Sequence, residues 1–513
     1  MAAALESRTG AEPDDTDALD PTPRRPRIPF AYCRRQGVLV HEAQADHTEL
    51  WFLDSTDPMA LSEVLRTLGS RPRLVKVDAR RFEAELREQQ HSESAHAMQE
   101  MEGIDADEGL TDLAELIPEP EDLMESADDA PIIRLINAVL TEAVKEHASD
   151  VHIEPFEDRL RVRFRVDGVL REVLAPKRAL APLVVSRIKV MAKLDIAEKR
   201  LPQDGRISLR VAGRAVDLRV STLPSGHGER VVMRLLDKHS ERFEFSRLGL
   251  DANDTARLKQ LIRRPHGILL VTGPTGSGKT TTLYTALTLL NEQSRSIMTI
   301  EDPIEYFLDG ISQTAVNPRI DMSFARGLRA ILRQDPDVVM VGEIRDLETA
   351  RIGVQSSLTG HLVLSTLHTN TAVGAVTRLA DMGIEPFLLA SSLNGVLAQR
   401  LVRRLCTDCA EAYEADAATL AALDQPTADT PVTLYRAAGC EQCHHSGYRG
   451  RVGIFELIEI DEALREAIHD GANEQQLERL ARRQGISIRE AGNRLAVDGV
   501  TTVDEVVRVT REA

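Results

Sequence analysis

The chain has 513 residues, 42% of them hydrophobic and 28% charged, enough for about three globular domains with cores of their own. Aromatic residues make up only 4%, with a single Trp51, and 81 acidic against 63 basic side chains give a net charge of −18. Nucleic-acid binding depends on basic surfaces that release counterions from phosphates, so this balance argues against a DNA or RNA partner. No run approaches the ~20 apolar residues that cross a bilayer, and no signal peptide is evident at the N-terminus. The sequence therefore predicts a cytoplasmic protein.

The first 130 residues divide by composition into three parts. Residues 1–27 are rich in Ala, Asp, Pro and Arg, which is typical of a disordered tail. Residues 28–98 are predicted to form a small α/β docking domain without a chemical motif. Its apolar runs and helical patterns lie at 37–40, 74–77, 60–68 and 81–88. Residues 99–130 hold 13 acidic residues and no Lys or Arg, so this block repels itself and is predicted to be an extended linker.

A middle domain, residues 131–237, is predicted to be α+β. It opens with a helical stripe of apolar residues from Ile132 to Ala143. Two hairpins follow, at 160–173 with its turn at Asp167-Gly168 and at 206–221. The helix predicted between them, residues 181–194, carries three basic residues, which we expect on a solvated face, a lipid-facing role being the weaker alternative: Arg187, Lys189 and Lys193.

Short apolar runs alternate with helical stretches after the linker 238–250. Four runs are predicted as buried strands: Ile268–Thr272, Ile297–Ile300, Val338–Val341 and Leu362–Thr366. Because apolar strands joined through helices form parallel sheets covered on both faces, residues 251–400 are predicted to be an α/β core. Residues 451–513 are predicted as a helical subdomain that begins with a short strand pair at Arg451–Ile458.

A phosphate-binding loop follows the first of these strands directly. Its string fits G-x-x-x-x-G-K-T in full: Gly273, Pro274, Thr275, Gly276, Ser277, Gly278, Lys279, Thr280 and then Thr281. Such a loop aims backbone N–H groups and a helix N-terminus at phosphates. We expect Lys279 to reach the β- and γ-phosphates and the Thr280 hydroxyl to hold Mg²⁺. The chain lacks the N-K-x-D string of GTPases and the L-S-G-G-Q string of transporters, so ATP is the expected nucleotide.

Acidic residues end two other predicted strands. Glu343 follows Val338–Val341, with Gly342 where an Asp often stands, and Glu301 ends the strand that runs into Asp302 and Glu305. ATP hydrolysis needs a carboxylate for the metal and a group that orients the attacking water, at the strand ends beside the loop. We expect Glu343 and Glu301 to share this work, and the sequence leaves open which is the base. His361 and His368 bracket the fourth strand, where a γ-phosphate sensor and a structural role are equally supported.

The four paired cysteines predict a metal site. Cys406-x-x-Cys409 and Cys440-x-x-Cys443 are two knuckles in a chain whose fifth cysteine, Cys33, stands alone. Two such knuckles complete a tetrahedral Zn²⁺ site with no open position, so the zinc would be structural. The alternatives are thiols without metal and a site in which His444 or His445 replaces one ligand. Residues 401–450 are predicted to form this insert, in which the metal site holds together the two ends of the segment 410–439.

Taken together, the motor motifs resemble those of the secretion ATPase superfamily, and in particular the assembly ATPases of type II secretion. The corresponding boxes are a Walker A, an Asp box, a Walker B and a His box, at Gly273–Thr280, Thr299–Tyr306, Leu332–Asp346 and Leu358–His368. The resemblance continues upstream through Ala148–Phe156, Pro202–Arg206 and His227–Val232, and it covers roughly residues 128–505.

The resemblance implies a RecA-like motor after a PAS-like middle domain, in a homo-hexamer with nucleotide sites between subunits. In that family arginines of the middle domain reach the phosphates, which implies roles for Arg219 and Arg234, with Arg329 and Arg333 contributing from the motor. It also implies that the N-terminal domain binds the cytoplasmic part of an inner-membrane secretion protein. Contacts with the inner-membrane platform protein and with acidic phospholipids are further implied options, at the cytoplasmic face of the membrane.

The implied function is ATP-driven assembly of a pseudopilus that exports folded proteins across the outer membrane. A type IV pilus extension ATPase shares every motor box and is the main alternative. DNA-uptake or conjugation ATPases are a weaker one, and a scaffold that binds ATP but barely hydrolyses it is another. Retraction ATPases are disfavoured because they are shorter and lack the cysteine insert.

Overall fold

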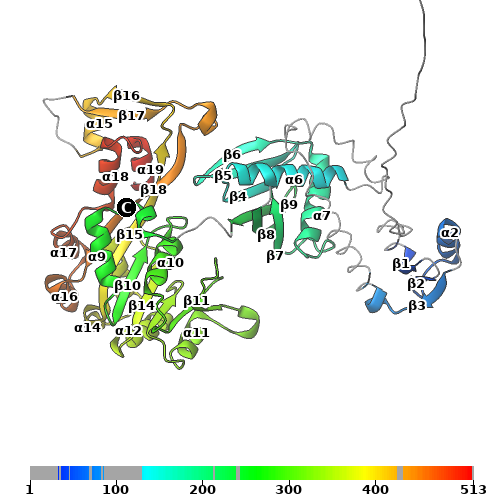
Figure 1. Ribbon diagram of the computed structural model, residues 1–513, viewed down its shortest axis with the longest axis horizontal. Helices are drawn as coiled ribbons and strands as arrows, with labels where there is room; N and C mark the ends of the chain where they lie inside the picture. The colour runs from blue at the N-terminus through cyan, green and yellow to red at the C-terminus, as the bar shows by residue number, and fades with distance from the viewer. Residues whose placement is uncertain are drawn as a thin grey trace, which may run out of the picture.

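The computed structural model describes residues 33, 36–44, 47–68, 72–82, 85, 130–211, 214–237, 243–424 and 431–510. Figure 1 shows three bodies in a row, with the N-terminal domain and the motor at opposite ends and the middle domain between them. Among the described helices, none combines the length and the apolar character needed to span a bilayer.

The N-terminal domain contains a three-stranded sheet, with α2 (Pro58–Leu68) packed on one face. The strands are β1 (Val38–Gln44), β2 (His47–Phe52) and β3 (Arg73–Lys76), in the order β1-β2-β3. Val38 and Leu50 pack against α2, while Trp51 packs on the other side with the buried Cys33. The sequence did not predict β2, and the helix expected at 81–88 lies largely outside the described residues.

The middle domain is a six-stranded antiparallel sheet with two long helices on one face. Helices α6 (Ala130–Lys145) and α7 (Ala181–Met191) share a core with the sheet. The sheet order is β6-β5-β4-β9-β8-β7. The bounds are β4 (Asp150–Pro155), β5 (Leu160–Val166), β6 (Val169–Leu174), β7 (Gln203–Val211), β8 (Arg214–Ser225) and β9 (Gly228–Asp237), with a short η2 (Arg178–Leu180) before α7. Both predicted hairpins are present, and the first turns at Asp167 and Gly168 as expected.

One expectation for α7 was wrong. Lys189 does not lie on a solvated face: its side chain is 1% exposed and forms an ion pair with Glu229. Its ammonium also donates to the carbonyl oxygen of Glu198, 2.8 Å away. The spacing of charged residues on a helix predicts a solvated face unless a partner allows their burial. Here that partner is a carboxylate on a strand 40 residues later, which the helix pattern does not contain.

The motor contains a seven-stranded sheet in the order β12-β11-β13-β14-β10-β15-β18. All neighbours are parallel except β15 and β18. The strands are β10 (Gly267–Thr272), β11 (Ile297–Glu301), β12 (Ser312–Ala315), β13 (Val338–Val341), β14 (Leu362–Leu367), β15 (Leu393–Leu405) and β18 (Tyr448–Glu459). The four predicted strands thus correspond to β10, β11, β13 and β14.

Helices cover both faces of the motor sheet, as the apolar strands predicted. Successive residues of β10 belong to two different cores: Ile268 and Leu270 pack with α12 to α14, and Leu269 and Val271 pack with α9 and α10. The helices are α8 (Phe245–Leu248), α9 (Ala252–Ile262), α10 (Lys279–Leu290), α11 (Phe324–Ile331), α12 (Leu347–Leu358), α13 (Ala372–Asp381) and α14 (Pro386–Ser392), with η3 (Pro318–Ile320).

The C-terminal region differs in one respect from the sequence interpretation. Its helices are present: α16 (Glu462–His469), α17 (Glu474–Ala481), α18 (Ile488–Val497) and α19 (Val503–Thr510). The expected strand pair at Arg451–Ile458 was wrong, however, because this segment is one continuous strand, β18, paired along its length with β15. The boundaries drawn at 400/401 and 450/451 therefore fall inside two long strands of the motor sheet.

Candidate active site

The phosphate loop joins the end of β10 to the start of α10 in a conformation that requires glycine. Gly273 has a φ of 145° and Gly278 a φ of 88°, values that residues with a Cβ rarely adopt. A Cβ on Gly273 would also lie 2.3 Å from the carbonyl oxygen of Gln399. Pro274, Thr275 and Gly276 are exposed around the loop, and Thr280 is exposed in the first turn of α10. The loop thus presents backbone and hydroxyl groups outward.

Lys279 folds back over this loop. Its ammonium donates to the carbonyl oxygens of Gly273 at 2.7 Å and Pro274 at 3.1 Å. Burial lowers the pKa of Lys279 to about 8, although the negative charge of Glu343 partly opposes the shift. The side chain is therefore partly desolvated in a position from which it can transfer its hydrogen bonds to phosphate oxygens.

The loop is held from below by β15. The amide of Gln399, which is 2% exposed, donates to the carbonyl oxygen of Ser277 and accepts from the Thr282 hydroxyl, both at 2.7 Å. On the other side, Thr272 and Thr369 are joined through their hydroxyls at 2.7 Å. Sequence reasoning missed Gln399 because no motif surrounds it and its partners lie more than 115 residues away.

Glu343 and His368 meet at the same edge of the sheet. Each follows a neighbouring strand, β13 or β14, and His368 Nε2 lies 3.3 Å from Glu343 Oε2. Arg345 pairs with Glu343 and also approaches Asp302, whose Oδ2 lies 3.6 Å from its NH1. The Glu343 side chain is 16% exposed. β14 lies between β13 and β10 in the sheet, and Glu343 is close enough to the loop for its charge to act on Lys279.

The second histidine does not belong to this edge. His361 precedes β14, and its Nδ1 lies 2.9 Å from the carbonyl oxygen of Ser356 at the end of α12. A six-residue strand, about 20 Å long at roughly 3.3 Å per residue, separates His361 from His368. Its proposed share in a γ-phosphate sensor was therefore wrong.

Glu301 is the last residue of β11 and Glu305 follows this strand, and the two carboxylates have different surroundings. Glu301 is 4% exposed and accepts hydrogen bonds from Tyr284, Thr299 and Gln313. Burial and the carboxylate of Glu301 raise the pKa of Tyr284. Glu305 instead faces the middle domain, where Arg219 NH1 lies 3.2 Å from its Oε2. The Arg219 guanidinium also donates to the carbonyl oxygen of Ile304 at 2.8 Å.

Close packing against the end of β11 explains why a glycine, Gly342, stands in the Walker B segment. The Gly342 N–H donates to the carbonyl oxygen of Ile300 at 2.8 Å. A Cβ at this position would lie 3.3 Å from that oxygen and 3.4 Å from Cα of Glu301. An Asp at 342 would therefore require the end of β11 to shift.

The other three candidate arginines have partners away from the loop. Arg234, directly across from Arg219 on the paired strands, donates to Asp150 Oδ1 at 3.0 Å. Arg329 pairs with Glu348 at 2.6 Å, and Arg333 donates to the carbonyl oxygen of Arg329. Of these four candidates, only Arg219 bridges the middle domain and the nucleotide edge of the motor in this conformation.

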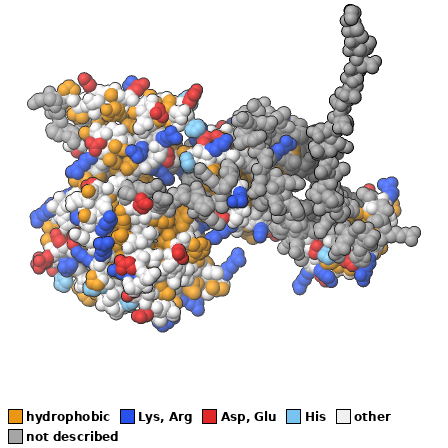
Figure 2. Space-filling model, in the orientation of Figure 1, with side chains coloured by type: hydrophobic (Ala, Val, Ile, Leu, Met, Phe, Trp, Pro, Cys, Tyr) orange, Lys and Arg blue, Asp and Glu red, His pale blue; other side chains and the backbone are white. Residues whose placement is uncertain are grey.

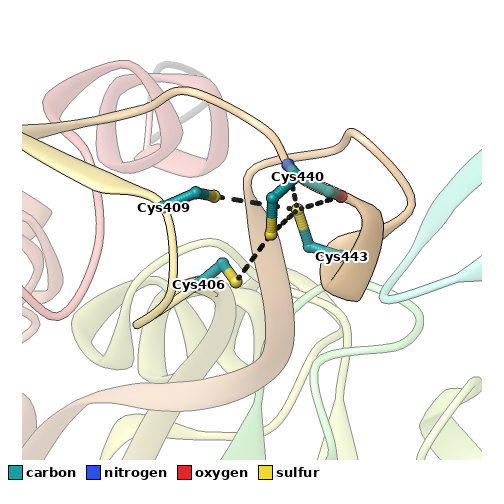
Figure 3. Close-up of side chains that lie close together, drawn as sticks. All are labelled: Cys406, Cys409, Cys440 and Cys443. Carbon is teal, nitrogen blue, oxygen red and sulfur yellow. Dashed lines mark hydrogen bonds between the residues drawn. The ribbon is translucent and has the colours of Figure 1, made fainter.

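The four paired cysteines lie together, as Figure 3 shows. Their sulfurs are all within 4.8 Å of one another, and three of the separations are 3.7 to 3.9 Å. Four thiolates around a tetrahedral ion with Zn–S bonds of about 2.3 Å would be about 3.8 Å apart. Although burial opposes it, the N–H groups of Cys440 and Gly447 lower the pKa of Cys443 to about 6. The cluster is therefore preorganised for a metal ion.

The cysteines join the ends of β15 and β18. Cys406 follows β15, and η4 (Glu441–Cys443) lies shortly before β18. Between the knuckles the chain forms the two-stranded sheet β16 (Ala410–Glu414) and β17 (Thr433–Ala437) with α15 (Ala417–Ala422). His444 and His445, in left-handed conformations after η4, are not in the metal-ligating group found among the described residues.

Two family models match this sequence. The family described as "Type II/IV secretion system protein" covers residues 125–508, and a second model, which describes an N-terminal domain of "GSPII protein E", covers residues 27–89. The type II secretion system protein E of Pseudomonas aeruginosa is 60% identical over 95% of this chain and 96% of its own length. The type II secretion system ATPase E of Vibrio cholerae is 59% identical over 95% and 97%.

Two solved structures align with about three quarters of this chain. The pilus retraction motor PilT, solved with bound ADP, aligns with a TM-score of 0.52 at 27% identity, over 73% of this chain and 96% of its own. The ATPase DotB of Legionella pneumophila aligns with a TM-score of 0.56 at 21% identity, over 74% and 96%. The latter is a likeness of fold alone.

Proposed function

This chain belongs to the type II secretion system protein E family and is a P-loop ATPase of secretion, and from that premise we propose that its ATP hydrolysis drives assembly of a pseudopilus for export of folded proteins. One observation carries the proposal: the phosphate loop, Glu343 and His368 meet at one edge of the sheet, and Arg219 reaches that edge from a second domain. Hydrolysis there can be converted into movement between the two domains.

The phosphate loop would bind the nucleotide. Its N–H groups and the N-terminus of α10 attract the phosphates, and Lys279 exchanges its bonds to the loop carbonyls for bonds to phosphate oxygens. Mg²⁺ bound with ATP offsets charge on the phosphate oxygens. Thr280 and Glu343 are the residues that would hold it, since Thr280 lies in the first turn of α10 and Glu343 lies at the same edge of the sheet.

We assign the water-orienting role to Glu305 in place of Glu301. The oxygens of Glu301 are already bonded to Tyr284, Thr299 and Gln313 inside the core, so this carboxylate is not free to take a proton from water. Glu305 lies four residues later, at the surface between the domains, with Arg219 as its charge partner. When Arg219 turns to a γ-phosphate, the Glu305 carboxylate is released toward the attacking water.

Arg219 and Arg234 are the proposed sensors of phosphate from the middle domain. They face each other across β8 and β9, so both point from the face of the sheet that α6 and α7 leave free. We place Arg329 and Arg333 at the nucleotide of a neighbouring subunit; within this chain they bond to Glu348 and to α11 itself. These roles require nucleotide sites between subunits, as in the homo-hexamer that the family resemblance implies.

The cysteine cluster would hold a structural Zn²⁺. Four sulfur ligands satisfy tetrahedral zinc and leave no position for a reacting water. Metal analysis of the purified chain should find about one zinc per chain. The Cys406→Ser, Cys440→Ser double variant should lose it, and an unmodified chain without zinc would refute this assignment.

The N-terminal domain would dock the motor. The match of residues 27–89 to an N-terminal domain of GSPII protein E supports this role. We propose that its partner is the cytoplasmic part of an inner-membrane secretion protein, which would hold the chain at the cytoplasmic face of that membrane. The inner-membrane platform protein and acidic phospholipids are proposed as further contacts.

The test is a Glu343→Gln substitution at the native locus, with Glu292→Gln as the control. Glu292 is an exposed acid on the motor surface. We expect secreted enzymes to accumulate in the periplasm of the Glu343→Gln strain only, while surface pili remain. If export continues and pili disappear, the motor serves pilus extension. If both processes continue, hydrolysis by this chain drives neither.

A further inference from the structure

We infer that the four-cysteine module, residues 406–447, holds the middle domain on the motor by fixing the start of β18 as a docking seat. This role goes beyond the proposed function, which requires the two domains to move but does not say where they stay joined. It also gives the cysteines a purpose that a structural metal alone does not explain.

The tip of the β5–β6 hairpin docks on this seat. Asp167 Oδ2 accepts a hydrogen bond from the backbone N–H of Gly450 at 2.8 Å. Its other oxygen, Oδ1, lies 3.5 Å from Nε of Arg451. Figure 1 shows this hairpin directed at the orange segment where β18 begins. Both oxygens of one carboxylate are therefore used in a contact between residues more than 280 positions apart.

A short series of hydrogen bonds links the cysteine cluster to the seat at the start of β18. The Gly447 N–H donates to Cys443 Sγ at 3.2 Å, and the Gly447 carbonyl oxygen accepts from the Cys406 N–H at 3.0 Å. Three residues later the Gly450 N–H meets Asp167. Because Cys406 follows β15 and Cys443 precedes β18, an ion that binds all four thiolates clamps these two strand ends together.

The seat is braced from the motor side as well. Tyr448, the first residue of β18, donates to or accepts from the Thr502 hydroxyl at 2.8 Å. The Arg403 guanidinium stacks over the Tyr448 ring at 3.9 Å and pairs with the buried Glu505 at 2.8 Å. The start of β18 is thus tied to α19 and β15 independently of the metal, so loss of the metal should loosen the seat without unfolding the motor core.

The middle-domain sheet connects the seat to the nucleotide edge. Cross-strand partners form one row over four strands: Arg165, Asp150, Arg234 and Arg219. At about 4.8 Å per strand this row spans about 14 Å. Arg165, at one end of the row, stands two residues before Asp167 in the chain, and Arg219 is at the other end. A rigid sheet held at Asp167 can therefore swing Arg219 toward or away from Glu305.

Hydrogen–deuterium exchange of the full-length chain tests the seat. Slow exchange of the Gly450 amide is expected in the unmodified chain. Asp167→Gly should speed it by about tenfold or more, since it removes the acceptor. Glycine suits the φ of 50° at this position, so the hairpin itself should be retained. Arg436→Gln, which removes an exposed arginine paired with Glu411 inside the module, is the matched control and should change nothing at Gly450.

Removal of metal with a chelator tests the part played by the cysteines. We expect exchange to rise in the hairpin at 165–170, although no cysteine lies in that domain, while α10 stays protected. Equal exchange at Gly450 in the unmodified and Asp167→Gly chains would show that the seat does not exist in solution. Faster exchange in 406–447 without any change at 165–170 would show that the module does not hold it. Neither outcome depends on ATP hydrolysis, so failure of the seat is distinct from failure of the proposed function.

Discussion

Glu301 and Glu305 stand four residues apart on one segment, and their surroundings predict different effects of the same substitution. Glu305→Gln should keep the fold and lower kcat by about 100-fold or more, since it removes the proposed proton acceptor. Glu301→Gln should mainly lower stability, by about 1–3 kcal/mol, because a buried acceptor of three hydrogen bonds loses its charge and part of its partners.

Thermal unfolding and steady-state ATPase rates of both variants separate these effects. Gln313→Ala removes one of the donors to Glu301 and serves as a control, since it should resemble Glu301→Gln. A Glu301→Gln chain that is fully stable but inactive would return the base to Glu301. A fully active Glu305→Gln chain would remove Glu305 from the mechanism.

Lys279 predicts a pH dependence of ATP binding. In the free chain its pKa is lowered to about 8, whereas an unfolded lysine has a pKa of about 10.4. Between these values the unfolded chain binds more protons, so the contribution of Lys279 to the free energy of unfolding rises with pH. ATP binding needs the charged form and should therefore take up a proton as the pH rises through about 8.

Calorimetry in two buffers with different ionisation enthalpies measures this uptake. It should be small near pH 7 and approach one proton per site near pH 9. Lys279→Arg keeps its charge across this range and should show no such rise. The same pH-dependent uptake in the arginine variant would assign the proton to another group.

In Lys279→Ala, hydrolysis should be lost while the chain stays folded.

At the scale of elements, β15 determines the shape of the phosphate loop. Gln399→Ala should leave the Ser277 carbonyl and the Thr282 hydroxyl without their buried partner, at a cost of about 1–3 kcal/mol. We expect this cost to lower the affinity for ATP by about tenfold or more. Gln355→Ala, on the exposed side of α12, is the control. Unchanged nucleotide binding would mean that the loop keeps its shape without β15.

The motor strands were predictable where burial on both faces leaves a continuous apolar run, as in β10 and β13. The phosphate loop was predictable because its glycines and lysine are adjacent in sequence. The pairing of β15 with β18 was not, since 42 residues separate the strands and their register depends on contacts across the sheet. Gln399, the burial of Lys189 and the separation of His361 from His368 likewise depend on distant partners, which a local pattern does not contain.

At the scale of the whole molecule, charge should control assembly. Each chain carries a net charge of −18, and on the face seen in Figure 2 acidic and basic side chains are interspersed over the motor. Bringing six such chains together is opposed by repulsion that acts over about 30 Å at 0.01 M salt and about 10 Å at 0.1 M. The ATPase rate per chain should therefore rise with protein concentration, and rise again when salt increases from about 0.01 M to about 0.1 M.

Mixing experiments distinguish cooperation from simple assembly. If sites lie between subunits and Arg329 or Arg333 acts on a neighbour's nucleotide, Glu343→Gln chains added to unmodified chains should lower the rate by more than dilution does. An equal mass of an unrelated protein provides the control for dilution. A Glu343→Gln, Arg329→Ala, Arg333→Ala chain should inhibit more strongly than Glu343→Gln alone, because it supplies neither its own hydrolysis nor arginines to its neighbour. A rate per unmodified chain that is constant in every mixture would mean that each chain hydrolyses ATP alone, and the intersubunit site would be wrong.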